Sequence, residues 1–347
     1  MKVGIIELNS MSLNKSKEFM KEIGEKAFRG EQLFSYFNRN KNLEVENLLQ
    51  FPKDLRSKLK EIGKVNSIKI LNRYDSKIDD TKKYLFVLED NNIIESVFME
   101  YKYGNTACIS TQVGCRMGCS FCASTKGGLV RNLQPSEMLN QIYMMEKDTH
   151  KDISNVVLMG SGEPLDNYDN VLEFMNIIHD EKGHNMSFRN ISLSTCGIVP
   201  KIYELAKENI PITLSISLHS PFDEERAKIM PIAKRYKIKE LMEACKFYAD
   251  STKRRLTFEY TLIENINDGD KEILELSKIL KGINAHINLI PLNPIKEYNK
   301  ERPNRDNIER FQNALLRKNI PATIRRELGS DISASCGQLR RRETNKE

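Results

Sequence analysis

Hydrophobic and polar positions follow a helical period in the first part of the chain. Between residues 13 and 62, apolar positions stand three and four residues apart, and the aromatic and leucine members of this set are Phe28, Leu33, Phe34 and Phe37. This spacing places apolar side chains on one face of a helix. Pro52 begins the run PKDLRSKLKEIG, and proline favours the first turn of a helix. We predict several short amphipathic helices in this region.

The pattern changes to a strand-like one between Ile68 and Thr111. The runs KYLFVLE, IIESVFMEY and ACIST are short and rich in β-branched and aromatic residues, and they are separated by the turn-like segments EDNN and KYGN. Short runs of this composition between turn residues are typical of β-strands. We predict a small antiparallel sheet that leads into a first core strand.

Strand-like and helix-like segments alternate from residue 133 onward. The apolar runs NVVLM, ISLST, ITLSIS, LTFEYTLI and HINLIPL are each separated by a stretch of helical length, and one such helix is expected to begin near Pro135. With ACIST these runs make six strand–helix units. Buried strands that alternate with helices indicate an α/β fold around a parallel sheet. In α/β barrels functional residues lie at the carboxyl ends of the strands.

Composition places the chain among globular proteins without defining a partner. Of its 347 residues 39% are hydrophobic and 29% are charged, and the net charge of +6 permits an anionic partner without establishing one. With few aromatic residues and no tryptophan, no base-stacking platform is evident. Neither a signal peptide nor an apolar run long enough for a bilayer is recognisable, so we expect a cytoplasmic protein without a membrane partner.

Three of the seven cysteines are clustered in the segment GCRMGCSFCAS. Cys115, Cys119 and Cys122 have the spacing Cys-x3-Cys-x2-Cys in a glycine-punctuated loop. Structural zinc usually takes four protein ligands, and no neighbouring histidine or cysteine supplies the fourth. A four-iron cluster on three cysteines leaves one iron open for a substrate or cofactor. We therefore favour an iron–sulfur cluster, with a zinc site as the alternative.

Further candidate binding residues follow the later strands. Gly162 and Glu163 lie in the loop MGSGEPLDN, where a carboxylate can bind the ammonium group of an amino acid. Ser194 closes ISLST, and Ser217, Leu218 and His219 close ITLSISLHS. Asn293 ends the sixth strand. Hydroxyl, imidazole and amide groups at strand ends can hydrogen-bond a ribose or a carboxylate, although a plain turn or a structural histidine explains each position equally well.

The string GCRMGCSFCAS followed by GGLVRNL resembles the RlmN/Cfr family of radical S-adenosylmethionine (SAM) RNA adenine methyltransferases. The resemblance implies a partial (β/α)6 radical SAM barrel over residues 106–325. A helical accessory RNA-binding domain (1–65) and a connecting β-sheet extension (66–105) would precede it, and a C-terminal segment (326–347) would follow. It also implies a 4Fe-4S cluster on the three clustered cysteines. SAM would contact the residues of the strand-end loops, namely Gly162, Glu163, Ser194, Ser217, Leu218, His219 and Asn293.

The same resemblance implies roles for three residues outside these loops. Cys336, in DISASCGQLRRR, would be methylated by one SAM molecule and would then deliver the carbon, activated by a radical from a second SAM molecule. Cys108 would release the product by forming a transient disulfide with Cys336, and Glu95 would accept a proton. Taken alone, Cys336 is an incidental thiol, Cys108 a small buried residue and Glu95 a solvent-facing carboxylate. Cys196 and Cys245 match no role and are expected to be packed thiols.

The expected reaction is methylation of the C2 carbon of an adenine in 23S rRNA, with tRNA as a second substrate. The strings GEPL and LIPLNP resemble the C2 branch of the family, whereas Ser161 departs from the usual methionine. The expected partners are RNA and a reducing protein such as flavodoxin or ferredoxin. Alternatives are C8 methylation of the same adenine, a non-catalytic iron–sulfur or zinc RNA-binding protein, and an enzyme that activates another by forming a glycyl radical.

Overall fold

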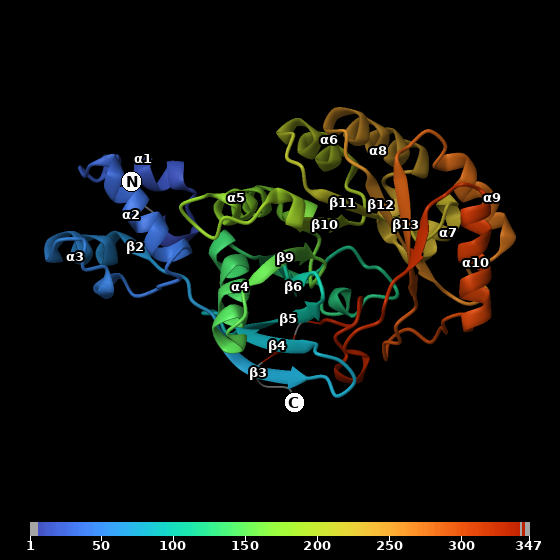
Figure 1. Cartoon of the computed structure of the whole chain (residues 1–347), viewed down its shortest axis with the longest axis horizontal. Helices are drawn as coiled ribbons and strands as arrows, with labels where there is room; N and C mark the ends of the chain where they lie inside the picture. The colour runs from blue at the N-terminus through green and yellow to red at the C-terminus, as the bar shows by residue number, and fades with distance from the viewer. Residues whose placement is uncertain (1–5, 341, 344–347) are drawn as a thin grey trace.

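The computed structural model describes residues 6–340 together with 342 and 343. Its first part contains the helices α1 (Leu13–Glu22), α2 (Ala27–Asn38) and α3 (Lys53–Ile62). Two short parallel strands, β1 (Ile6–Glu7) and β2 (Gly63–Lys64), join its two ends (Figure 1). These helices enclose a hydrophobic cluster of their own. The predicted amphipathic helices are therefore confirmed.

One sheet organises the rest of the chain. Along its path the strand order is β14-β13-β12-β11-β10-β9-β6-β5-β4-β3, and β15 pairs with β5. The antiparallel part consists of β3 (Lys69–Asp75), β4 (Lys82–Val87) and β5 (Asn92–Tyr101), with β15 (Arg342–Glu343) added to β5. The predicted antiparallel sheet is thus present, and it is continuous with the parallel one.

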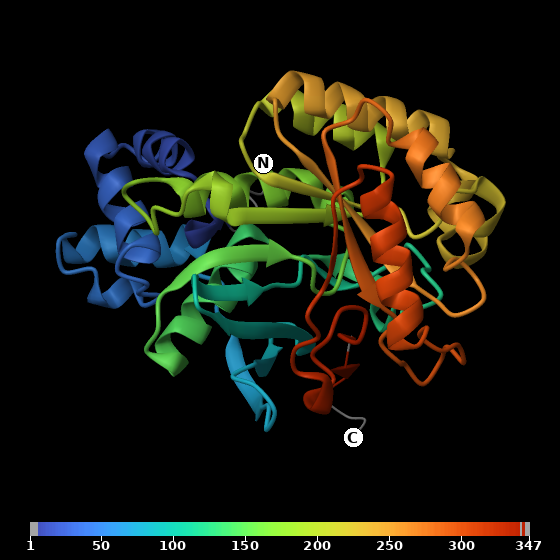
Figure 2. The ribbon, with the colours of Figure 1, turned by 45° about the vertical axis from the view of Figure 1, so that its right-hand side comes forward.

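The parallel part contains the six predicted strands in sequence order. They are β6 (Gly104–Cys108), β9 (Ile153–Leu158), β10 (Ile191–Thr195), β11 (Thr213–Ser217), β12 (Leu256–Leu262) and β13 (Ala285–Pro291). A further parallel strand that the sequence did not indicate, β14 (Ala322–Ile324), pairs with β13. Within the described residues β14 and β3 end the path unpaired with each other, and Figure 2 shows the sheet curving without closing. This open form agrees with the predicted partial barrel.

In the described part of the chain, seven α-helices connect the strands and cover one face of the sheet (Figures 1 and 2). They are α4 (Pro135–Thr149), α5 (Tyr168–His179), α6 (Val199–Glu208), α7 (Asp223–Ile229), α8 (Ile238–Thr252), α9 (Asp270–Ile279) and α10 (Arg305–Arg317). The helix expected near Pro135 begins at that residue. No helix in the described part of the chain has both the length and the apolar character that crossing a membrane requires.

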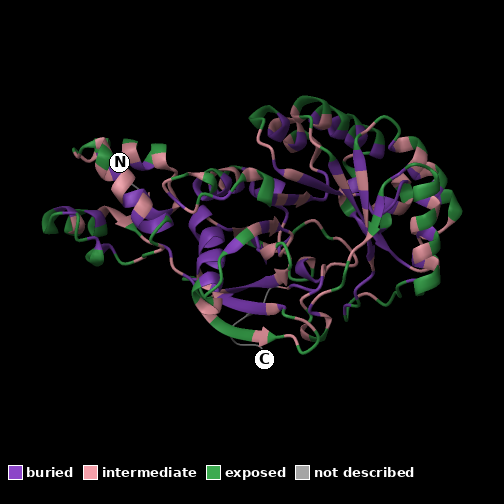
Figure 3. Cartoon of the chain, in the orientation of Figure 1, coloured by how far each residue is buried: buried purple, intermediate pink, exposed green. Residues whose placement is uncertain are grey.

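Alternation along the parallel strands separates the core from the concave face. Leu193, Ile216 and Leu289 belong to the main hydrophobic cluster beneath the helices. Their neighbours Ser194 and Ser217 line a pocket instead. Successive side chains of a strand point to opposite faces of the sheet. The apolar set therefore packs under the helices, whose inner sides are buried in Figure 3, and the polar set faces the concave side.

The cysteine-rich loop lies between two short antiparallel strands, β7 (Gln112–Gly114) and β8 (Leu129–Asn132). A 3-10 turn at Ala123–Thr125 follows the third cysteine of the cluster. Because β7 comes directly after β6, the loop starts at the carboxyl end of the first parallel strand.

Candidate active site

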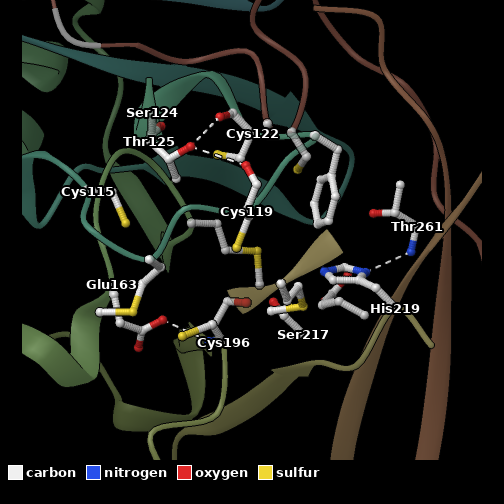
Figure 4. A pocket seen from close by; sticks show the side chains of 18 of the residues that line it. Cys115, Cys119, Cys122, Ser124, Thr125, Glu163, Cys196, Ser217, His219 and Thr261 are labelled. Atoms are coloured by element: carbon white, nitrogen blue, oxygen red, sulfur yellow. Dashed lines mark hydrogen bonds between the residues drawn. The ribbon is translucent and has the colours of Figure 1, made fainter. Parts of the chain in front are cut away.

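A pocket of about 930 Å³, partly open to solvent, lies at the carboxyl ends of the parallel strands. We call it the main pocket. It contains all three clustered cysteines and most of the residues predicted after the strands (Figure 4). Its lining includes Cys115, Cys119, Cys122, Gly162, Glu163, Ser194, Cys196, Ser217, His219, Glu259, Asn293, Arg325 and Cys336.

The backbone of the cysteine loop is held at both ends. The N–H of Cys115 donates to the carbonyl of Gly128 at 3.0 Å. The Thr125 hydroxyl donates to the carbonyls of Cys119 (3.1 Å) and Cys122 (3.0 Å). Gly114 has φ 75°, and a Cβ there would stand 1.9 Å from the Gly128 oxygen, so this closure requires glycine. The loop thereby presents the three thiols to one pocket.

Burial keeps these thiols protonated in the absence of a positive centre. It raises the pKa of Cys115 to about 12 and raises the pKa of Cys119 and Cys122 as well. Only the thiolate ligates a metal, so binding of a metal centre here must release protons.

Gly162 and Glu163 line the main pocket. Glu163 is buried, and its carboxylate accepts the N–H groups of Cys196 (2.7 Å) and Leu165 (3.0 Å). Burial raises the pKa of Glu163, and these hydrogen bonds lower it in part. The glutamate therefore holds the loop against β10 and also presents a carboxylate to the pocket (Figure 4). Cys196, expected only to be a packed thiol, is buried and lines the same pocket.

The backbone at Gly162 requires glycine, which leads to a testable result. Its φ is 113°, and a Cβ would stand 2.7 Å from the Gln112 side chain. We expect Gly162→Ala to destabilise the fold by about 2–5 kcal/mol, the sum of a left-handed backbone cost and of overpacking. Gly282→Ala is the matched control because Gly282 has φ 81° and open space around it, so it should lose only about 1–2 kcal/mol. Equal losses in urea unfolding would contradict the close contact at Gly162.

His219 is held as a neutral hydrogen-bond donor. Its Nδ1 accepts the N–H of Thr261 at 2.9 Å, which places the proton on Nε2. Burial lowers the pKa of His219 to about 3, so the ring stays uncharged at neutral pH. The ring packs edge-on against Phe121, with 4.8 Å between the centroids. Its other nitrogen faces the pocket in Figure 4, next to Ser217.

Leu218 is placed differently from its neighbours. Its side chain belongs to the main core, and the residue does not line the main pocket. Its carbonyl accepts from Nε of Arg226, a fully buried arginine that also donates to the carbonyls of Cys196 and Ser217. Arg226 therefore links the segments that follow β10 and β11 by hydrogen bonds, and Leu218 takes part through its backbone carbonyl.

Cys336 occupies the junction between the main pocket and a second one. This side pocket includes Val97, Met99, Tyr101, Cys108, Arg325, Cys336 and Leu339. The segment around Cys336 is fixed by Asn293, which donates to the Cys336 carbonyl (3.0 Å), and by the N–H of Ala123, which donates to the Gly337 carbonyl (2.7 Å). The thiol is thus brought beside the cysteine loop and, on its other side, beside Cys108.

Cys108 and Cys336 share the side pocket as free thiols. The pKa of Cys108 is raised to about 12, mainly by burial and also by the nearby Cys336, while the Arg325 guanidinium acts to lower it. Arg325 in turn has its pKa raised mainly by Cys336, and its guanidinium lies 3.8 Å from the Glu259 carboxylate. Sequence reasoning assigned neither Arg325 nor Glu259 to the site. Glu259 stands within a strand, and Arg325 follows one too short to be recognised, so neither carries a motif.

Glu95 is fully buried, so it is not a solvent-facing carboxylate. Its carboxylate lies 3.3 Å from the Lys83 ammonium, also buried, and accepts the N–H of Arg340 at 3.0 Å. Glu95 does not itself line the side pocket. It stands on the same face of β5 as Val97 and Met99, which do.

Comparisons with known proteins agree with this site. Residues 6–65 match the Ribosomal RNA large subunit methyltransferase N-terminal domain, and residues 109–277 match the Radical SAM superfamily. A probable dual-specificity RNA methyltransferase RlmN from Clostridioides difficile (strain 630) is 52% identical over 97% of this chain and 98% of its own length. Another from Lachnoclostridium phytofermentans is 49% identical, with 98% and 96% covered.

The chain belongs to the RlmN family of radical SAM methyltransferases. A solved structure of a radical SAM methyltransferase from Sphaerobacter thermophilus has the same fold, with a TM-score of 0.90 and 38% identity over 96% of this chain and 99% of that one. Membership implies a 4Fe-4S cluster and SAM.

The site fits the cluster better than it fits a single ion. In the part of the chain that the structure describes, no three histidine, cysteine or acidic side chains are arranged to hold one metal ion. A 4Fe-4S cluster of this family takes three cysteine thiolates and leaves one iron for SAM, whereas structural zinc usually takes four protein ligands. Cys115, Cys119 and Cys122 line one pocket that also holds the polar groups predicted for SAM. The zinc alternative is therefore not favoured.

Proposed function

We propose that this RlmN-family enzyme methylates the C2 carbon of an adenine in 23S rRNA and in tRNA. The observation that carries the proposal is the position of Cys336. It lines both the main pocket, with the three clustered cysteines, and the side pocket, with Cys108. A cysteine that receives a methyl group on one side and meets a resolving cysteine on the other must occupy such a junction.

The main pocket supplies the groups that hold the cluster and SAM. Cys115, Cys119 and Cys122 would ligate the cluster, which with SAM supplies the radical that activates an unreactive methyl group. Glu163 and Gly162 would meet the amino-acid end of SAM. His219 would donate from Nε2, and Ser194, Ser217 and Asn293, which line the same pocket, would offer further hydrogen bonds. Leu218 was predicted to contact SAM. Because its side chain is packed in the core, only its backbone could make that contact.

Two cysteines divide the carbon transfer and the release. An adenine C2 is electrophilic, so it does not attack a methyl donor directly. Cys336 would carry the methyl group, and its activated carbon would bond to C2. The adduct would lose one electron to the redox centre and its C2 proton to Glu95. The Cys108 thiolate would then attack the Cys336 sulfur, forming a disulfide as the sulfur–carbon bond breaks, and the released carbon on the base would take up a proton to become the methyl group. The Arg325 guanidinium lowers the pKa of the Cys108 thiol, against the larger effect of burial.

Glu95 is the proposed acceptor of the proton. Two facts support it: its place on the pocket-facing side of β5, and its hydrogen bond to Arg340, four residues beyond Cys336. Lys83 also donates to the Ser333 carbonyl, so one buried ion pair contacts both sides of the segment that carries Cys336. A shift of that segment would connect the carboxylate with the side pocket.

The remaining parts of the proposal concern organisation and partners. We divide the chain into an accessory RNA-binding domain (1–65), a β-extension (66–105), the catalytic partial barrel (106–325) and a terminal segment (326–347). The match of residues 6–65 to an rRNA methyltransferase N-terminal domain supports the first boundary. We expect a reducing partner such as flavodoxin or ferredoxin and a cytoplasmic location, where RNA and reduced thiols are both found.

The product distinguishes C2 from C8 methylation. We expect anaerobically reconstituted enzyme, with SAM and a reductant, to form 2-methyladenosine in 23S rRNA and tRNA, measured by mass spectrometry after nuclease digestion. The relatives named dual-specificity RNA methyltransferase RlmN favour this outcome. A dominant 8-methyladenosine peak would assign the chain to the other branch. SAM cleavage without any methylated adenosine would point to one of the non-methylating alternatives.

A further inference from the structure

A third hollow, of about 730 Å³, opens at the opposite ends of the parallel strands from the cysteine loop. We call it the outer hollow. It lies where β6, β9 and β10 begin and where the antiparallel β5 ends. Its walls include Tyr101, Tyr103, Asn155, Arg189, Asn190 and Arg325.

The outer hollow adjoins the side pocket. Met99, Tyr101 and Arg325 line both of them. The side pocket contains Cys336, which must touch the target base if the proposed function holds. We therefore consider a route from the protein surface past Tyr101 and Arg325 to the donor thiol, from the side away from the cluster and SAM.

Two tyrosines form an aromatic platform at the mouth of this route. The rings of Tyr101 and Tyr103 are stacked, with centroids 4.9 Å apart and an angle of 12° between their planes. Tyr103 is 74% exposed. Stacked, exposed aromatic rings are the usual platform for unpaired bases. The end of the β5–β6 hairpin thus presents an exposed aromatic pair that the composition did not indicate.

Charge and polarity at the mouth suit a nucleotide. The charged residues that line the outer hollow are Arg189 and Arg325, and no carboxylate lines it among the described residues. Arg189 is exposed and forms no ion pair within the described part of the chain. Asn155 and Asn190 add amide groups that can meet a sugar or a base edge. Single-stranded RNA is recognised by this combination of stacking, hydrogen bonds and phosphate contacts.

We infer that the outer hollow holds the nucleotide next to the target adenine, with its base stacked on Tyr103 and its phosphate at Arg189. The target base, extruded from its own stack, passes Arg325 to reach Cys336. This inference rests on the proposed function and adds the path and the contacts of the RNA. Tyr103 is thus a positioning residue for substrate.

Replacing the ring tests the platform. We expect Tyr103→Leu to raise KM for an RNA stem-loop roughly tenfold, whereas Tyr103→Phe stays near wild type, because stacking needs the ring and not the hydroxyl. Iron content, SAM binding and melting temperature should not change. Phe247→Ala is the matched control: Phe247 is 42% exposed and pairs with the Tyr203 ring (5.1 Å) but lines none of these pockets. It should leave KM unchanged.

A photocrosslink tests the contact itself. A stem-loop with 5-iodouridine next to the target adenine should, on irradiation, attach to the peptide that contains Tyr103, and Tyr103→Leu should lose the adduct. Moving the iodouridine several nucleotides away should also remove it. Arg189→Gln should weaken RNA binding and reduce the slope of log K against log salt by about 0.7, the value for one phosphate contact with a single strand.

These outcomes separate the inference from the proposed function. If wild-type enzyme forms no 2-methyladenosine in the same assay, the proposed function fails. If the wild type methylates but Tyr103→Leu keeps the wild-type KM, or the adduct maps to another peptide, the inference about the outer hollow is overturned while the function stands.

Discussion

Replacing Cys115, Cys119 or Cys122 with alanine should abolish reductive cleavage of SAM. All three cysteines line one pocket, and each would supply the ligand of a different iron, so no remaining thiol in the loop replaces a missing one. Wild-type protein reconstituted without air should be brown and should release 5′-deoxyadenosine under reduction. The variants should bind less iron and release none, as measured by iron analysis and chromatography.

Cys245→Ala is the matched control for this loss. Cys245 is fully buried in α8 under the sheet and lines none of these pockets, so its replacement removes a thiol without touching the loop. It should retain iron and SAM cleavage, with a loss of stability of about 1 kcal/mol. Continued release of 5′-deoxyadenosine by the triple alanine variant would remove the cluster from these three cysteines.

Cys336→Ala and Cys108→Ala should stop the reaction at different stages. Without Cys336 there is no carrier for the methyl group, so methylated adenosine should fall to background while iron content stays normal. Without Cys108 the carbon–carbon bond should still form, but nothing resolves the link between Cys336 and the base. A covalent protein–RNA adduct should then accumulate, visible on a denaturing gel.

The double variant is the control for this pair. Cys108→Ala combined with Cys336→Ala should give no adduct, because the link requires the Cys336 sulfur. Cys108→Ala with normal turnover and no adduct would remove Cys108 from the mechanism, and would leave its place beside Cys336 as packing alone.

Several of these residues could be recognised from the sequence, because the patterns that mark them involve only neighbouring positions in the chain. The spacing of Cys115, Cys119 and Cys122 places three thiols in one loop whatever surrounds it, and the alternation in ISLST marks Ser194 as facing away from the core. The six parallel strands and their helices were predictable for the same reason, since periodicity is set by neighbours in sequence. The additional strand β14 was not, because three residues are too few for a period.

Only the tertiary structure decided how the distant parts meet at the site. The segment from Arg325 to Arg340 crosses from β14 to β5, where it contacts Glu95 and brings Cys336 beside Cys108, more than 200 residues earlier in the chain. That crossing also decides which residues lie near Cys336. Sequence alone does not show that Arg325, Glu259 and the Tyr101–Tyr103 pair are among them or close to them. The sequence by itself determined the elements and the chemistry of the cysteine loop, because local spacing encodes both. Proximity across an open sheet depends on long-range packing, which no local pattern records.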